Sequence, residues 1–203
     1  MHKWKRRKDH RPLEILLAAL DLFVKNGFSA TKINDIAAQA NVSKGTVYLY
    51  YESKESLFKS MVYELMIPKI SEVENYIEQY QGKQVDLLHF VIQKWWQTAK
   101  EEGLVGIPKL ILSEANNFPD VAQFYVKEVI HRIQAILVNI LESGYLQGEF
   151  RKVDKVLTSR VILSSLVYFS MWDTTLKKYD HGALNVEELI QQQVDIIING
   201  IKN

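Results

Sequence analysis

The sequence predicts an all-α fold of about nine helices. Apolar residues recur at the i, i+3, i+4, i+7 spacing of an amphipathic helix along almost the whole chain. No run of alternating apolar and polar residues is bounded by an Asn-Gly or Asp-Gly turn. Glycines and prolines stand between the periodic segments, where helices would end. These three observations leave no segment that favours a strand.

The first and fourth helices have clear start and stop signals. Apolar residues between 13 and 24 follow the helical rhythm, Pro12 suits a first turn, and Gly27 suits the left-handed residue that ends a helix. Ser53 is a candidate N-cap for a fourth helix, which should kink or end at Pro68. This fourth helix would connect a domain over residues 1–62 with a second domain over residues 63–203.

Two short helices are expected between these longer ones. Thr31 can cap a helix that runs to residue 40, and Ser43 can cap another that runs to about residue 51. Only Asn41 and Val42 separate the two. Short helices joined by a tight turn, with a longer helix on each side, are typical of a helix-turn-helix, whose second helix enters the DNA major groove.

The second domain should be helical throughout. We expect helices near residues 84–101, 107–116, 119–147, 154–178 and 186–201. Gly103, the pair Phe118-Pro119, Gly148 and the segment YDHGALN separate them.

Composition excludes several classes of function. The 203 residues include no cysteine, so the chain has no disulfide framework and no thiol chemistry. No segment approaches the roughly 18–20 apolar residues that span a bilayer, and the basic start MHKWKRRKDHR lacks the apolar core of a signal peptide. We therefore expect a cytoplasmic protein with no membrane partner.

Catalytic and metal-binding motifs are also missing from the sequence. The five histidines show no HExxH spacing, and no nucleophile elbow, phosphate loop or dinucleotide fingerprint is present. We therefore expect no metal, no cofactor and no enzymatic activity.

The charge is divided unevenly along the chain. Residues 1–60 hold 11 Lys and Arg against 6 Asp and Glu, whereas the remainder holds 14 against 18. The N-terminal part therefore carries the positive field that attracts a polyanion. The first eleven residues could form an arm in the minor groove or a solvated, disordered end that adds only non-specific attraction.

A helical wheel assigns roles to the segment 43–51. At about 100° per residue, Val47 and Tyr51 share one side and should face the core. Gly45 and Leu49 lie opposite, where glycine lets the backbone approach the bases and leucine can contact a thymine methyl. Lys44 could reach a guanine edge or a phosphate. Contacts with the phosphate backbone, which fix register without reading sequence, are expected from Thr46, Tyr48, Tyr50 and Lys54, and Lys32 could add one. Thr31 and Ser43 complete the expected DNA-binding residues.

The segment FVKNGFSATKINDIAAQANVSKGTVYLYYESKESLF resembles the DNA-binding segment of the tetracycline-repressor (TetR) family of bacterial regulators. The similarity extends over roughly residues 12–62. Three positions depart from the family pattern: Tyr51 replaces a usual phenylalanine, Asn41 a common glycine, and Lys32 a frequent threonine. The residues that match it are Phe28, Thr31, Ile36, Ala37, Val42, Ser43, Gly45, Tyr48, Tyr50, Lys54, Glu55 and Leu57.

The resemblance implies a homodimer that binds a near-palindromic operator of double-stranded DNA and represses transcription until a small molecule binds the C-terminal domain. In the family the last two helices form the dimer interface, and residues 157–176 and 186–201 here have the matching position and character. Residues 118–150 are similar to the AcrR-like branch, which includes regulators of efflux and of lipid metabolism.

Aromatic residues on separate predicted helices could line an apolar cavity for the effector. Glu114 and Asp173 are candidate anchors for a cationic effector. An aromatic residue at helical spacing can equally belong to an ordinary core. The candidate lining residues are Trp95, Trp96, Phe124, Tyr125, Tyr168, Met171 and Trp172.

Two other classes of function stay open at this point. An architectural or protein-binding helical module would bind DNA with little sequence preference and strong salt dependence. A repressor should prefer its operator by a factor on the order of 10³ or more. An all-α enzyme lacks any candidate set of acid, base and nucleophile in this sequence.

Overall fold

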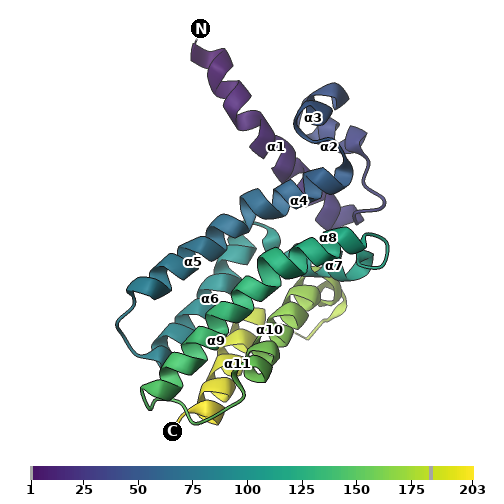
Figure 1. The fold of residues 1–203 in the computed structure, drawn as a ribbon. Helices are drawn as coiled ribbons and strands as arrows, with labels where there is room; N and C mark the ends of the chain where they lie inside the picture. Colours follow the sequence, from purple (N-terminus) through teal and green to yellow (C-terminus); the bar gives the residue numbers. More distant parts are fainter. Residues whose placement is uncertain (1, 183–184) are drawn as a thin grey trace.

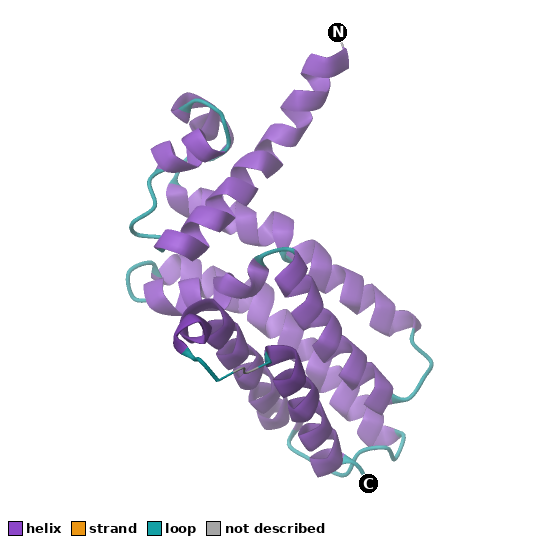
Figure 2. Ribbon diagram, turned by 180° about the vertical axis from the view of Figure 1, so that it is seen from behind, coloured by secondary structure: helices purple, strands orange, loops and turns teal. Residues whose placement is uncertain are grey.

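The computed structural model describes residues 2–182 and 185–203, and all of its regular structure is helical in that part of the chain (Figures 1 and 2). One isolated bridge pairs Phe150 with Lys202. The predicted all-α fold is therefore confirmed, and each expected helix is present.

The N-terminal unit consists of α1 (His2–Asn26), α2 (Ile33–Gln39) and α3 (Lys44–Tyr50), with the start of α4 (Lys54–Leu65) packed against α1. The rings of Phe23, Phe28 and Phe58 meet in its core at centroid distances of 5.0 to 6.0 Å. Gly27 ends α1 with a φ of 88°, as the sequence predicts.

The helix α1 is longer than expected. Its backbone is helical from His2, so Pro12 lies inside the helix and not at its start. The N-terminal turns project away from the rest of the molecule in both ribbon views (Figures 1 and 2). The basic start is therefore a helical extension in this structure and not a disordered end, and its contact with the minor groove stays a prediction.

The C-terminal unit is a bundle of longer helices. It contains α5 (Ile67–Gln79), α6 (Gln84–Glu101), α7 (Ile107–Glu114), α8 (Pro119–Tyr125), α9 (His131–Leu146), α10 (Lys155–Met171) and α11 (Val186–Ile201). The expected fourth helix is divided at Met66 into α4 and α5, with Pro68 in the first turn of α5. The expected domain boundary at residue 62 lies inside α4.

Short non-α turns interrupt the helical rods. The 3-10 turn η1 (Leu104–Gly106) precedes α7, and the turns η3 (Trp172–Leu176) and η4 (Lys177–Tyr179) follow α10. The turn η2 (Val126–Ile130) joins α8 to α9 and is a π-helix, as is η3. Residues 119–147 and 154–178, each expected to form one continuous helix, are therefore interrupted by π-turns.

Candidate nucleic-acid interface and effector cavity

The geometry of α3 agrees with the wheel drawn from the sequence. Val47 is fully buried and Tyr51 is nearly so, with its hydroxyl donating a hydrogen bond to the Pro12 carbonyl at 3.2 Å. Burial raises the pKa of Tyr51 to about 12, with Glu64 and Tyr50 contributing in the same direction. On the opposite side Leu49 is 74% exposed and Gly45 is exposed. The helix thus presents a narrow, apolar outer edge.

Local hydrogen bonds position α3. The Ser43 hydroxyl accepts from the Thr46 amide at 3.1 Å, so Ser43 is the N-cap that the sequence predicts. Its oxygen also lies 2.8 Å from the Thr46 hydroxyl. Asn41 adopts a φ of 53° in the turn before α3, a conformation that Asn accepts more readily than most residues. This explains how Asn41 replaces the glycine common at that position.

Polar and aromatic side chains flank the exposed edge of α3. Lys44 is exposed, and its ammonium lies 5.8 Å from the centre of the Tyr48 ring. Tyr48 is 46% exposed, whereas Tyr50 is half-buried against Tyr51. Lys32 is exposed at the N-cap of α2. These side chains surround one surface, which is the candidate DNA-binding face.

Two of the predicted DNA contacts have internal roles. Thr31 is 2% exposed, and its hydroxyl donates to the carbonyls of Gly27 and Leu22 at 2.7 and 3.1 Å. It is therefore neither a surface contact nor the cap of α2, whose N-cap is Lys32. The Lys54 ammonium is also occupied, as it donates to the carbonyls of Phe28 (2.7 Å), Thr31 (3.1 Å) and Ser29 (3.3 Å). The prediction that its charge faces a phosphate is wrong.

An apolar cavity of about 210 Å³ lies in the C-terminal unit. Its walls come from the break between α4 and α5 and from α5, α6, η1, α7, α9 and α10. The inner end is closed by buried residues, among them Leu104, Pro108 and Leu166. The exposed lining residues Glu72, Tyr76, Phe90 and Lys94 lie on α5 and α6, so the cavity opens between these two helices.

The mouth of the cavity carries most of its charge. Lys69 is paired with Glu102 at 3.3 Å and lies 3.8 Å from Glu72. Lys94 forms no ion pair with any residue that the structure describes, and it is exposed. The Tyr76 and Phe90 rings, which also line the cavity, lie tilted against each other with centroids 4.7 Å apart. An apolar interior with an unpaired cation at the opening suits an amphipathic, anionic ligand.

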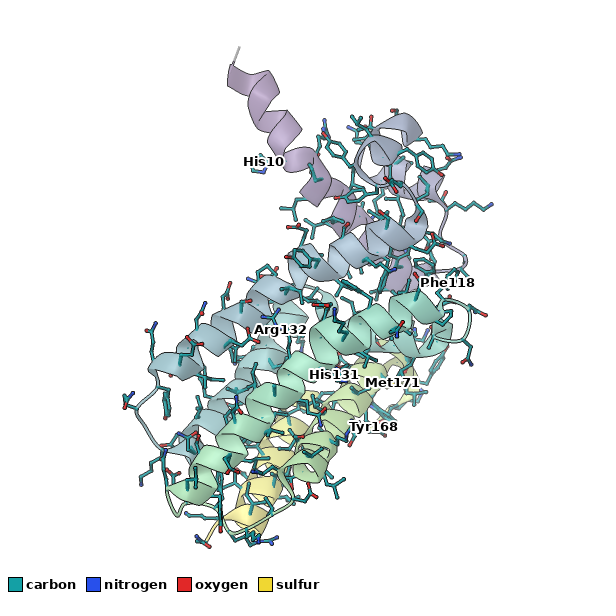
Figure 3. The ribbon with its side chains drawn as sticks, in the orientation of Figure 1. His10, Phe118, His131, Arg132, Tyr168 and Met171 are labelled. Atoms are coloured by element: carbon teal, nitrogen blue, oxygen red, sulfur yellow. The ribbon has the colours of Figure 1, made fainter. Side chains whose placement is uncertain are left out.

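Only one of the predicted cavity residues lines this space. Trp95 does so, whereas its neighbour Trp96 is buried on another side of α6. The rest of the prediction is wrong, because Tyr168 is 53% exposed on the surface of α10 and the others pack elsewhere in the bundle (Figure 3). The residues outside the cavity are Trp96, Phe124, Tyr125, Tyr168, Met171 and Trp172.

The two predicted anchors for a cation also lie outside the cavity. Asp173 pairs with Lys177 one turn along, at 2.6 Å. Glu114 accepts hydrogen bonds from the Ser29 amide and hydroxyl at 2.9 and 2.8 Å, which tie α7 to the loop after α1. It is therefore a contact between the two units and not a ligand anchor.

Glu114 is held as a carboxylate by its surroundings. Burial opposes its charge, but hydrogen bonds from Asn117 and Ser29 and the nearby Lys54 ammonium outweigh that effect and lower its pKa. Two further contacts join the units: the Phe28 and Phe118 rings meet edge-on at 4.5 Å, and Lys59 pairs with Asp120 at 2.6 Å. The cavity-bearing bundle is thus connected directly to the helix-turn-helix.

Family models match both units. Residues 15–61 match the model described as bacterial regulatory proteins of the TetR family, and residues 106–201 match the tetracyclin repressor-like C-terminal domain. The chain belongs to the TetR family. It is a DNA-binding, ligand-regulated transcriptional repressor, and its relatives are regulators and not enzymes.

Similar proteins cover nearly the whole chain. The fatty acid metabolism regulator protein of Bacillus subtilis is 27% identical over 97% of this chain and 99% of its own length. The repressor KstR2 of Mycolicibacterium smegmatis is 25% identical over 93% of this chain and 89% of its own. The structure of FadR from Bacillus subtilis in complex with stearoyl-CoA superposes with a TM-score of 0.78 at 24% identity, over 93% of this chain and 98% of that one.

No helix in the described part of this TetR-family chain has the length and apolar character needed to cross a membrane.

Proposed function

We propose that this chain is a homodimeric repressor that binds an inverted-repeat operator through α3 and is released when a long-chain acyl thioester enters the cavity. The observation that carries the choice of effector is the cavity itself, with its apolar interior, closed inner end and cationic mouth at Lys94. The relative named for fatty acid metabolism supports the same class.

The size of the cavity supports a slim ligand. Its 210 Å³ lies below the roughly 300–1,000 Å³ of sites that enclose a drug-sized ligand. An acyl chain can enter with its narrow end, while a bulky, negatively charged head group stays at the opening between α5 and α6. Lys94 is then the residue placed to meet that head group.

The DNA-binding face supports direct reading of bases by the outer edge of α3. Leu49 and Gly45 approach the base edges, and Lys44, Tyr48 and Lys32 contact the flanking strands. Two copies of α3 in a dimer would reach half-sites about one helical turn, roughly 34 Å, apart.

Exposed apolar residues on the last two helices support the dimer. Leu157, Val161 and Tyr168 lie along one face of α10, and Ile196 is exposed on α11. The Ser164 hydroxyl on the same face donates a hydrogen bond to the Val161 carbonyl at 2.9 Å. It therefore needs no hydrogen bond from a second protomer. An exposed apolar stripe of this kind is typical of a protein interface.

Sedimentation tests the dimer. The double substitution Leu157→Glu and Val161→Glu should give monomers, because it places charges in the stripe, whereas Gln81→Glu in the exposed α5–α6 loop should not. A double variant that still sediments as the wild type does would exclude this interface.

Titration with stearoyl-CoA tests the effector. The wild-type protein should bind it, with a change in the fluorescence of Trp95, and should release operator DNA as it binds. Coenzyme A alone tests the head group, and a ketosteroid tests the class named for the structurally similar KstR2. Release by the steroid and not by stearoyl-CoA would overturn the proposed effector class.

A further inference from the structure

Two helical rods run side by side from the helix-turn-helix to the cavity, and each is interrupted near its middle. The first rod is α4 and α5, which meet at Met66. The second is α8 and α9, which are joined by the π-turn η2 at Val126–Ile130. In Figure 1 the rods follow the same direction, and α4 contacts α8 while α5 contacts α9. Both interruptions therefore lie at a similar depth in the molecule.

Polar contacts join the rods on each side of the interruptions. On the DNA side, Lys59 of α4 pairs with Asp120 of α8 at 2.6 Å. On the cavity side, Arg132 of α9 donates to Glu74 through Nε at 3.0 Å and through Nη2, and Nη2 also donates to the Ser71 hydroxyl at 2.9 Å. A two-pronged arginine–carboxylate contact fixes orientation as well as distance.

The cavity touches the rods almost only on the cavity side of these interruptions. Ile70 and Val73 of α5 and Ile133 and Leu137 of α9 line it, and Met66 lines it at the break itself. No lining residue comes from α8. A ligand therefore presses on the halves that Arg132 ties together, and an effect that travels along these two rods must pass the two interruptions.

A π-turn is suited to be such a joint. It holds one more residue than an α-helical turn, is rare, and occurs most often inside helices at functional sites. Its residues Val126 and Lys127 are exposed, so neighbours do not fix the outer side of the turn. When the backbone hydrogen bonds of the turn change their spacing by one residue, α8 shifts against α9 while both helices keep their internal hydrogen bonds. Packed elements convert small shifts of this kind into movements of whole units.

We propose that η2 is the joint through which occupancy of the cavity moves the DNA-binding unit: α9 stays fixed to α5 through Arg132, while α8 shifts with α4 through Asp120 and Lys59. The proposal rests on the proposed function for its ligand-regulated operator binding. It adds the element that carries the regulation.

Deletion of Lys127 is the decisive variant. Because a π-turn accommodates one extra residue, removing one should yield a regular α-helix in which α8 and α9 keep their present faces. Lys127 is exposed, and its ion pair is with the adjacent Glu128, at 3.1 Å. The matched control is Lys127→Ala, which removes the same charge and keeps the turn.

The readout is the ratio of operator dissociation constants with and without saturating stearoyl-CoA, for the full-length dimer. Allosteric coupling typically corresponds to about 5- to 150-fold, so the wild type and Lys127→Ala should show at least a fivefold ratio. The deletion variant should bind operator and stearoyl-CoA within threefold of the wild type, with a ratio below twofold. A deletion variant that keeps the wild-type ratio would overturn the joint.

Filling the cavity separates failure of the joint from failure of the effector assignment. Ala99 is a buried lining residue on α6, so Ala99→Phe mimics occupancy without any added ligand. It should weaken operator binding at least fivefold in the wild-type background and less than twofold in the deletion background. If stearoyl-CoA releases no DNA but this pattern holds, the effector is wrong and the joint stands. An equal effect of Ala99→Phe in both backgrounds, or none in either, overturns the joint.

Discussion

Lys54→Met should destabilise the protein and leave DNA affinity nearly intact. The substitution removes an ammonium that donates to three carbonyls around the loop after α1 and lies 4.6 Å from the centre of the Phe28 ring. Hydrogen bonds to charged groups contribute about 1.5–3 kcal/mol each, but these three share one donor and the carbonyls lie close to water. We therefore expect a total loss of about 2 kcal/mol.

The assay is thermal unfolding at fixed protein concentration, together with operator binding well below the transition. A loss of this size lowers Tm by about 4–8 °C in a chain of 150–250 residues. Lys32→Met is the matched control, since Lys32 is exposed and its side chain forms no capping hydrogen bond. It should leave Tm within about 1 °C and reduce the salt dependence of DNA binding by about one phosphate contact. An unchanged Tm for Lys54→Met, with DNA binding lost, would refute the internal role of Lys54.

Three further predictions concern the DNA face, the cavity and the contact between the units. Tyr48→Phe should weaken binding to all DNA sequences to a similar degree, whereas Leu49→Ala should change which sequences are preferred; selection from a random pool measures both, and identical preferences would contradict the assignment. Trp95→Ala should weaken stearoyl-CoA binding by about tenfold, as expected for the loss of about 1.4 kcal/mol of contact, while Trp172→Ala, which alters an aromatic residue outside the cavity, should change it less than twofold; calorimetric titration, which does not depend on the Trp95 signal, measures both. Because the pKa of Glu114 is lowered in the folded state, its contribution to stability is present above the ordinary carboxyl pKa and is lost as the pH falls through the lowered value. Glu114→Gln should therefore flatten the acid side of the unfolding free energy against pH, and an unchanged curve would exclude this role.

Local chemistry explains which features of the fold were predictable. Ser43 and Ser53 are recognisable as N-caps because capping depends on residues within three positions. The exposed edge of α3 follows from helical periodicity alone. The role of Thr31 is not predictable in this way, because a threonine before a helix can cap it or bond elsewhere, and its bonds to the Leu22 and Gly27 carbonyls are set by tertiary packing.

The cavity could not be predicted in the same way. Periodicity separates buried from exposed faces, but it does not distinguish a face that packs in the core from one that lines a space. Trp95 and Trp96 are adjacent and equally apolar, yet a rotation of about 100° along α6 places only Trp95 at the cavity. The contact between Tyr76 and Phe90 at the mouth depends on the packing of α5 on α6, which local sequence patterns do not contain. The π-turn η2 was also missed, because one extra residue shifts the apolar pattern too little to be seen.

The most direct test of the regulator assignment is selection of bound sequences from a random duplex pool by the purified protein at a stated salt concentration. An enriched inverted repeat, with half-sites about one helical turn apart, is the result expected of a dimer that reads bases with two copies of α3. Binding that is strongly salt dependent but enriches no motif, even after bound small molecules have been removed, would contradict it and favour an architectural role.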